Sequence, residues 1–218
     1  MNMNNREINR LLSTDSQGDD LTEKQKRIVE SAIEMFSEKG FSASSTSEIA
    51  RRAGVAEGTI FRHYKTKKDL LLAIVTPVMS NLVAPFIVRD LDKVLKQEYE
   101  HYEDFLKAMV RNRHDFIRRH LPIVKILIQE IPFQEELRSQ FINLVAKDIY
   151  RRFEKIVIHF QEKGELIQVP PSSVIRLSIS SIIGFFFARY IFLPENEWNE
   201  EEEINITIQF IMNGFKAR

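Results

Sequence analysis

The chain has no cysteine and little glycine or proline, with seven of each in 218 residues. The absence of cysteine excludes disulfides and thiolate metal sites, and it fits the reducing cytoplasm. Few helix breakers, beside abundant Leu, Ile, Glu and Lys, favour a mostly helical protein. The length is sufficient for one large domain or two smaller ones with a real core.

The chain also lacks an excess of charge, because 31 basic residues balance 31 acidic ones. This balance argues against a protein that binds nucleic acid over its whole surface. No secretory signal is visible at the polar, Asn-rich start. The most apolar run, residues 182–193, is too short for a membrane span and contains Arg189. We therefore expect a cytoplasmic protein without a membrane segment.

The first third of the sequence predicts an arm followed by a small helical domain. Residues 1–20 are polar without a sustained period and are expected to form a flexible arm. Thr22 and Gln25 form a capping box that begins a helix ending at Gly40, and Thr66 with Asp69 forms another. Between them, two short helices lie at 45–53 and 56–64. Residues 21–68 are therefore predicted to be one domain.

Between the two short helices lies a sharp turn. Ser45, three residues before Glu48, predicts the start of the first helix, and Gly54 can take the left-handed conformation that the reversal needs. Ile60 and Tyr64, four residues apart, are expected to pack inward on the first helix. This arrangement is typical of a helix-turn-helix, whose second helix can enter the major groove of DNA.

The remaining residues, 69–218, are predicted to form a larger helical domain. The helix that begins at Thr66 should kink at Pro77, and Pro85 marks an irregular stretch. Further helices are expected at 91–98 and 104–120, then as a short helix that ends at 130, and then at 134–163, 172–193 and from 204 onward. The predicted fold is all-α, with about nine helices and a three-helix head at the N-terminus.

The charge is unevenly distributed. Residues 39–68 hold seven Lys and Arg residues but two acids. A local basic patch on a helix-turn-helix is the expected footprint for phosphate contact. Taken alone, the same charges would be read as solvated helix ends, since cations also favour the C-terminus of a helix. Beside the helix-turn-helix, we favour DNA.

Four sequence segments strongly resemble the TetR family of bacterial transcriptional regulators: EKGF at 38–41, EIARRAGV at 48–55, GTIFRHY at 58–64 and TKKDLL at 66–71. They cover about 50 residues in nearly gap-free order, whereas the rest of the chain resembles the family only in the number and length of its helices. The resemblance implies a DNA-binding head, an effector domain with a ligand pocket, and a homodimer.

The resemblance also implies roles for residues of the second helix. It places Glu57, Thr59 and Arg62 near base edges, and Phe61, His63 and Lys67 largely on the phosphate backbone. Arg62 can pair with guanine O6 and N7, while Ser45 and Thr46 lie at a helix N-terminus that suits phosphate. Gly58 either permits close backbone approach to DNA or is simply tolerated. Two residues depart from the family pattern: Phe61 replaces the usual Tyr, and Ala56 the usual Ser. The predicted DNA-binding residues are Ser45, Thr46, Glu57, Gly58, Thr59, Phe61, Arg62, His63 and Lys67.

Aromatic residues are abundant in the C-terminal domain, since Phe alone supplies 16 residues of the chain. Each could simply be core, but a helical domain of this size can also hold an apolar ligand. The cations Arg113, Arg118 and Arg189 near apolar stretches are better explained by salt bridges than by an anionic ligand. We predict a pocket for a small apolar ligand, lined by some of Phe105, Met109, Phe116, Phe141 and Phe185.

A stripe of small residues on the helix at 172–193 predicts a close helix neighbour, since so much apolar surface needs a partner. The resemblance implies a two-fold interface built from the last two helices of each subunit, and burial within one chain is the alternative. The predicted interface residues are Leu177, Ser181, Gly184, Ala188, Ile204, Ile208, Ile211 and Phe215.

Nothing in the sequence indicates an enzyme, a metal site or a cofactor. His101, His114, His120 and His159 lack the spacing of metal ligands, and neither a Ser elbow nor a P-loop is present. We therefore expect a repressor that binds a palindromic operator as a homodimer and is released by a small apolar or amphipathic ligand. The alternative is a DNA-binding regulator without such a ligand, controlled by a protein partner. A helical enzyme ranks third.

Overall fold

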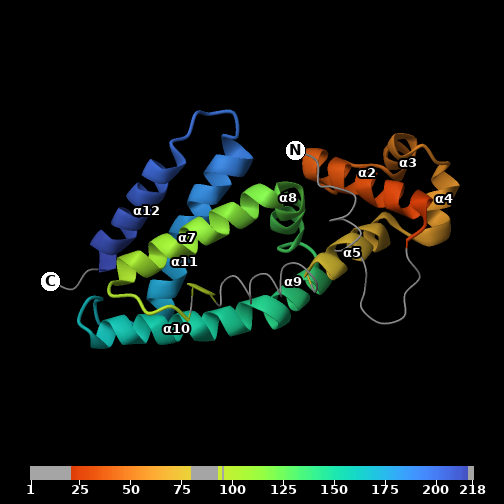
Figure 1. Ribbon diagram of the computed structural model, residues 1–218. Coiled ribbons are helices and arrows are strands. Elements are labelled where there is room, and N and C mark those ends of the chain that lie inside the picture. Colours follow the sequence, from red (N-terminus) through yellow and green to blue (C-terminus); the bar gives the residue numbers. More distant parts are fainter. Residues whose placement is uncertain (1–20, 80–92, 95, 216–218) are drawn as a thin grey trace. The chain divides into compact units, whose positions relative to one another are not determined.

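The computed structural model of the chain describes residues 21–79, 93–94 and 96–215 (Figure 1). Within these ranges it contains ten α-helices and two π-helical segments, which confirms the all-α prediction. The predicted arm at 1–20 and Pro85 lie outside the described residues. Of the helix expected at 91–98, residues 93–94 are helical and residues 96–98 are not, while 91, 92 and 95 also lie outside the described residues. The chain forms two compact units, Met1–Ile87 with Arg119–Val145, and Val88–Arg118 with Ala146–Arg218. The boundary predicted after residue 68 divides the chain by function and stays a prediction.

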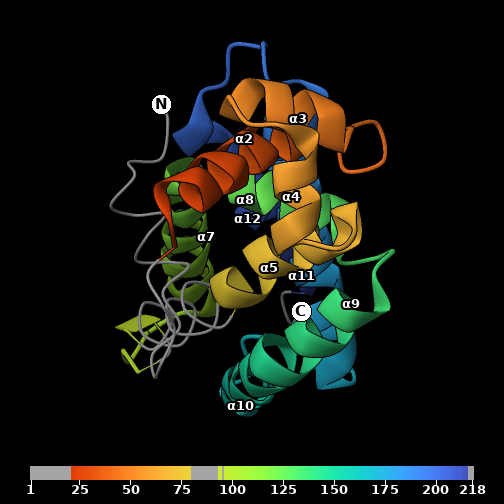
Figure 2. The same ribbon diagram turned by 90° about the vertical axis from the view of Figure 1, so that its right-hand side faces the viewer.

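The first unit holds the predicted helix-turn-helix. Within this unit α2 packs against α3, α5 and α8, α3 packs against α4, and α5 packs against α9 (Figures 1 and 2). The core includes Ile28, Phe36 and Leu70, all fully buried. Its helices are α2 (Glu23–Lys39), α3 (Thr46–Ala53), α4 (Glu57–His63), α5 (Lys67–Pro77), α8 (Leu121–Glu130) and α9 (Glu135–Phe141).

Side-chain caps fix where the helices of the head begin. Both predicted capping boxes are complete at Thr22 and at Thr66, where the N3 side chain also binds the cap's own backbone. At Ser45 the box is half formed: the hydroxyl accepts from the Glu48 N–H, but the Glu48 carboxylate accepts from Lys39 and from the Ser45 hydroxyl and not from the Ser45 N–H. Each cap satisfies an amide that the helix itself leaves without a partner.

The second unit is built around an aromatic cluster. Phe105, fully buried, has its ring centroid 5.3 Å from that of Phe153 and 5.8 Å from that of Tyr102. Tyr102 in turn meets Phe160 edge-on at 5.5 Å. Such offset and edge contacts add to the gain from burial. The helices are most of α7 (Tyr102–Arg119), α10 (Lys147–Glu162), α11 (Pro171–Phe187) with η3 (Ala188–Phe192), and α12 (Glu200–Phe215).

Two long helices of the sequence contain wide π turns. The helix expected at 134–163 consists of α9, η2 (Ile142–Ala146) and α10, and the helix expected at 172–193 consists of α11 and η3. The second run, Pro171–Phe192, has 22 residues and a mean hydropathy of 1.5, so length and composition alone would let it cross a membrane. This corrects the expectation that the apolar run is too short. Core helices of globular proteins meet the same criteria, and 39% of this stretch is buried within the chain.

Candidate DNA-binding interface

The turn between α3 and α4 has the geometry that the sequence predicts. Gly54 takes a left-handed conformation with φ 65° and ψ 39°, and the Val55 N–H donates to the Ala50 carbonyl at 3.0 Å. Ile49 and Ile60 are fully buried, and Tyr64 is also buried. The inward face of α4 therefore holds the helix against the head and leaves its other faces to solvent.

Three successive side chains at the end of α4 are exposed. Phe61, Arg62 and His63 all face solvent, and Phe61 is 46% exposed although it is a large apolar residue. Among the described residues no carboxylate pairs with Arg62. An unpaired guanidinium and an exposed ring on the short second helix are available to a partner such as DNA.

Gly58 is not required by packing within the chain. A Cβ atom built on Gly58 would meet nothing within 4 Å, and its φ is not positive. Neither crowding nor backbone conformation therefore explains a glycine in this helix, where it costs roughly 1 kcal/mol relative to alanine. The two interpretations of Gly58, close approach of DNA to the backbone and simple tolerance of a glycine, therefore both stay open.

Two of the predicted DNA-binding residues are bonded to each other. The Thr46 hydroxyl at the start of α3 donates to Glu57 Oε1 at the start of α4, over 2.6 Å. Both residues are partly buried. The carboxylate that the resemblance places near base edges is thus held by the residue that was predicted to contact phosphate. The sequence gives no signal for this pair, because the contact depends on how the two helices pack.

The basic patch predicted at 39–68 is partly neutralised by acidic residues of the first unit. Lys39 lies 2.9 Å from Glu48, Arg52 lies 3.0 Å from Glu38, and Lys68 lies 2.7 Å from Glu136. The hydrogen bond from Lys39 holds the pKa of the Glu48 carboxyl below its usual value. Among the described residues, the patch cations without an ion pair or hydrogen bond are Arg51, Arg62 and Lys65. The patch available to phosphate is therefore smaller than the count of charges indicates.

Lys67 has a different environment from the one predicted. Its ammonium donates to the carbonyl oxygens of Phe41 at 2.8 Å and Ser44 at 2.7 Å, with Ser42 at 3.4 Å, and it lies 4.5 Å from the centre of the Phe41 ring. Phosphate contact by this ammonium would require it to leave these acceptors. Lys65, two residues earlier, is exposed and is the better placed cation.

The five residues predicted to line a ligand pocket lie in different surroundings. Phe105 belongs to the aromatic cluster, Phe116 is buried, and Phe185 is buried against Trp198 with their ring centroids 6.1 Å apart. Met109 is half-buried in the second unit, and Phe141 is half-buried in the first. The predicted ligand pocket stays a prediction.

The four α12 residues of the predicted dimer interface lie inside the chain. Ile204, Ile208, Ile211 and Phe215 are all buried within the chain, because this face of α12 packs against the rest of the second unit. The outward face of α12 instead carries Ile206, 51% exposed, and Phe210, 72% exposed. On α11, Leu177 and Gly184 are exposed and Ser181 is partly exposed, and Ala188, the first residue of η3, is also partly exposed.

Two of the three cations near apolar stretches, Arg118 and Arg189, form salt bridges with Glu200, whereas Arg113 donates to Asn112 Oδ1 at 3.1 Å. The Glu200 carboxylate lies 3.3 Å from Arg189, 3.8 Å from Arg118 and 3.2 Å from Nε2 of the buried His114. The histidine ring also stacks on Phe186 at 6.3 Å. This geometry agrees with the interpretation of Arg118 and Arg189 as salt-bridge partners.

Comparison with known proteins identifies the head. Residues 28–74 match the family described as bacterial regulatory proteins, tetR family. Over 161 residues the chain is 36% identical to the uncharacterized HTH-type transcriptional regulator YvdT of Bacillus subtilis, covering 74% of this chain and 68% of that protein. It is 38% identical over 65 residues to the fatty acid metabolism regulator protein of the same organism, covering 28% of this chain and 34% of that protein.

Solved structures show the same fold. The transcriptional regulator FadR from Bacillus subtilis, in complex with stearoyl-CoA, superimposes with a TM-score of 0.62 at 20% identity, covering 86% of this chain and 97% of that chain. The chain spans about half the length or less of several curated relatives, the matched segments covering 45%, 50% and 34% of them. The family match at residues 28–74 contains the helix-turn-helix.

Proposed function

Because the chain belongs to the tetR family of bacterial regulatory proteins, we propose that it regulates transcription by binding DNA through α4. The observation that carries this proposal is the exposed, unpaired Arg62 on a second helix whose opposite face is buried. Arg62 reads a guanine by a bidentate pair, and Lys65 and His63 contact phosphate. Gly58 lets the sugar-phosphate backbone approach the helix.

Base readout by Arg62 is tested with DNA fragments selected for tight binding by the wild-type protein. Arg62→Ala should cost about 1–3 kcal/mol of binding free energy and relax the preference at one base position per half-site. Lys65→Ala is the matched control, because it removes one nearby charge and should weaken binding to all sequences alike. Equal losses on specific and random DNA for Arg62→Ala would show that this arginine does not read a base.

We further propose that the protein acts as a homodimeric repressor on a palindromic operator. Two heads related by a two-fold axis match two half-sites, and one head alone makes too few phosphate contacts for tight binding. The exposed apolar residues of α11 and α12, above all Leu177, Ile206 and Phe210, favour a partner helix pair on this face. The proposed interface is therefore this outward face, not the buried stripe of α12.

Release from DNA by a small apolar or amphipathic ligand completes the proposal. The named function of one relative, fatty acid metabolism regulation, and the stearoyl-CoA in a structure of the same fold support long-chain acyl thioesters as the first compounds to test. A ligand must favour the non-binding state by about 3 kcal/mol to lower operator affinity roughly 100-fold. An operator affinity that a broad panel of such compounds leaves unchanged would favour control by a protein partner instead.

A further inference from the structure

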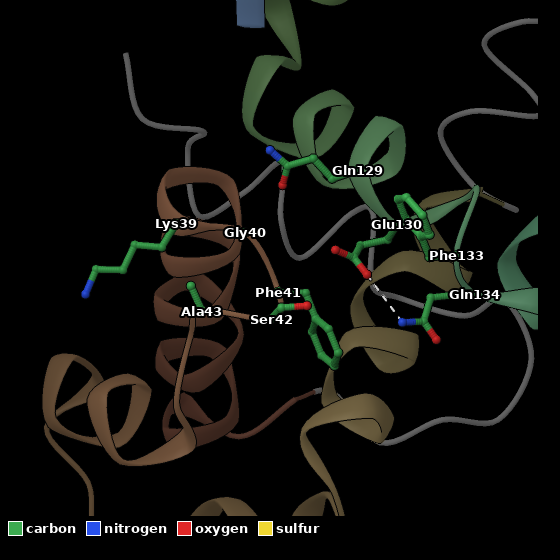
Figure 3. A pocket seen from close by; sticks show the side chains of 9 residues that line it. All are labelled: Lys39, Gly40, Phe41, Ser42, Ala43, Gln129, Glu130, Phe133 and Gln134. Atoms are coloured by element: carbon green, nitrogen blue, oxygen red, sulfur yellow. Dashed lines mark hydrogen bonds between the residues drawn. The ribbon is translucent and has the colours of Figure 1, made fainter.

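A hollow of about 410 Å³ lies inside the first unit, between the turn after α2 and the end of α8 (Figure 3). One wall is formed by residues 39–43, where Gly40 ends α2 with a φ of 80°. The other wall is formed by Gln129 and Glu130 at the end of α8, with Phe133 and Gln134 beyond it. The volume falls within the range of small-molecule sites, roughly 300–1,000 Å³.

The wall on α8 contains a buried carboxylate without a cation. Glu130 is 8% exposed, and its carboxylate accepts from the neutral Gln134 side chain, whose Nε2 donates to Oε2 at 3.3 Å. Figure 3 shows this carboxylate directed toward the Phe41 segment. Lys39 also lines the hollow, but its ammonium lies 2.9 Å from Glu48. No cation among the described residues pairs with Glu130. A buried carboxylate with one neutral donor is undercompensated, so the site favours a positive charge.

Gln129 supplies a second unsatisfied acceptor. Its Oε1 is buried and has no hydrogen-bond partner among the described residues. It lies near Gly40, since a Cβ atom built there would be 3.6 Å from it. Buried acceptors are normally paired, and those that are not call for an explanation. Because this oxygen is buried, an N–H donor in the hollow can reach it only after the Gln129 side chain rotates.

Phe133 adds an aromatic face at the rim. Its side chain is 83% exposed, the highest exposure among the exposed large apolar residues of the described chain. A free ring beside a carboxylate attracts an organic cation, because the ring face is electron-rich and the carboxylate is anionic. Phe41, by contrast, already has the Lys67 ammonium 4.5 Å from its ring centre.

We propose that this hollow binds a small organic cation that carries N–H donors and an apolar or aromatic body. Its cationic group binds Glu130 and Gln129, and its body packs on Phe133. The ligand joins the end of α8 to the turn that leads into Ser45, the cap of α3. It thereby restrains the turn that leads into the helix-turn-helix. The ligand binds at residues other than those predicted to line the effector pocket. The binding itself needs no DNA, so a failure of the proposed function and a failure of this ligand site can be told apart.

The test uses benzamidine as the probe, with benzamide as its neutral analogue of nearly the same shape. Calorimetry and amide chemical shifts should show saturable benzamidine binding centred on residues 39–43 and 129–134. Benzamide should bind about tenfold or more weakly, because it lacks the charge that the carboxylate pairs with.

Variants assign the binding to named residues. Glu130→Gln should lose about tenfold in benzamidine affinity and Phe133→Ala several-fold, whereas Glu135→Gln, an exposed glutamate next to the hollow, should change nothing. Phe133→Ala alters a surface side chain, so it tests the site even if Glu130→Gln unfolds. Equal binding of benzamide, or unchanged binding in both Glu130→Gln and Phe133→Ala, would overturn the proposal.

Discussion

Thr46 and Glu57 are joined by a hydrogen bond of 2.6 Å that links the first residue of α3 to the first residue of α4. The bond fixes one oxygen of the carboxylate and leaves the other to accept from a base amino group, such as cytosine N4. We therefore propose that Thr46 acts on DNA recognition through Glu57.

Thr46→Val, which keeps the shape but removes the hydroxyl, should free the Glu57 side chain. Because a hydrogen bond to a charged group contributes about 1.5–3 kcal/mol, we expect weaker discrimination at one base position per half-site. Binding to a set of single-base operator variants measures this. Thr46→Ser keeps the hydroxyl and should keep the preference; if Val and Ser behaved alike, the bond would have no part in recognition.

Gly58→Ala should change stability and DNA binding in opposite directions. Alanine favours a helix by roughly 1 kcal/mol over glycine, and the chain offers nothing for the new methyl group to strike. The melting temperature should therefore rise while operator affinity falls. Gly214→Ala, in α12 and equally uncrowded, is the control and should raise stability without weakening DNA binding. A Gly58→Ala variant that binds DNA normally would mean that the glycine is only tolerated.

Lys67→Ala and Lys65→Ala should separate a structural cation from a DNA-binding one. Removing Lys67 deprives the turn carbonyls of their shared donor and should cost about 1–3 kcal/mol of unfolding free energy. Removing the exposed Lys65 should leave stability within about 0.5 kcal/mol and lower the salt dependence of DNA binding by about one ion per subunit. Urea unfolding and salt titrations of binding measure the two effects, and the reverse assignment would restore Lys67 as the phosphate contact.

Gly184→Trp should prevent dimer formation without disturbing the fold of one chain. The position is exposed and uncrowded within the chain, so a large side chain there meets only a partner helix. Phe210→Glu should have the same effect by placing charge on the outward face of α12. Sedimentation measures the outcome, with the exposed Phe133→Glu as the control. Dimers of normal strength in both variants would place the interface elsewhere.

Stability should fall steeply at alkaline pH because of buried tyrosines. Burial raises the pKa of the Tyr102 phenol to about 12, above its usual value of 10.0. Between these values the unfolded chain loses the phenolic proton and the folded chain keeps it, so the free energy of unfolding falls as pH rises, by about 1.4 kcal/mol per pH unit. Below the lower value the contribution is fully present.

Tyr102→Phe should therefore make the alkaline decline shallower in urea unfolding measured across this range. Some decline remains, because burial also raises the pKa of Tyr190 to about 12. Tyr150→Phe, at an exposed position, should leave the slope unchanged. A Tyr102→Phe variant with the wild-type slope would contradict the assignment.

Local signals in the sequence were sufficient for the helices and the turn of the head. The boxes at Thr22 and Thr66 and the left-handed Gly54 depend on residues three or four apart, so the pattern determines them. Contacts between distant residues could not be predicted. Lys67 binds carbonyls 23 to 26 residues away, and no spacing rule reaches so far.

The apolar stripe of α12 shows the same limit in another form. Its period identifies a face that must be buried, but period alone does not say whether the covering surface belongs to the same chain. Ile208 is fully buried in one chain, so residues of the same chain cover this face. The outward position of Phe210 could be recognised only once the packing was known. The π turns at 142–146 and 188–192 likewise leave no mark in the residue pattern.

The packing of α5 determines which helices must accompany the DNA-binding head when it is transferred to another protein. Leu70, Leu71 and Ile74 are fully buried, and α5 packs on α2. A fragment cut after residue 68 would keep the Lys67 ammonium but lose the apolar side chains that anchor the helix carrying it. A chimaera that joins this head to another effector domain must therefore include α5. It must also include α8 or replace the surface that α8 covers, because α8 packs on α2.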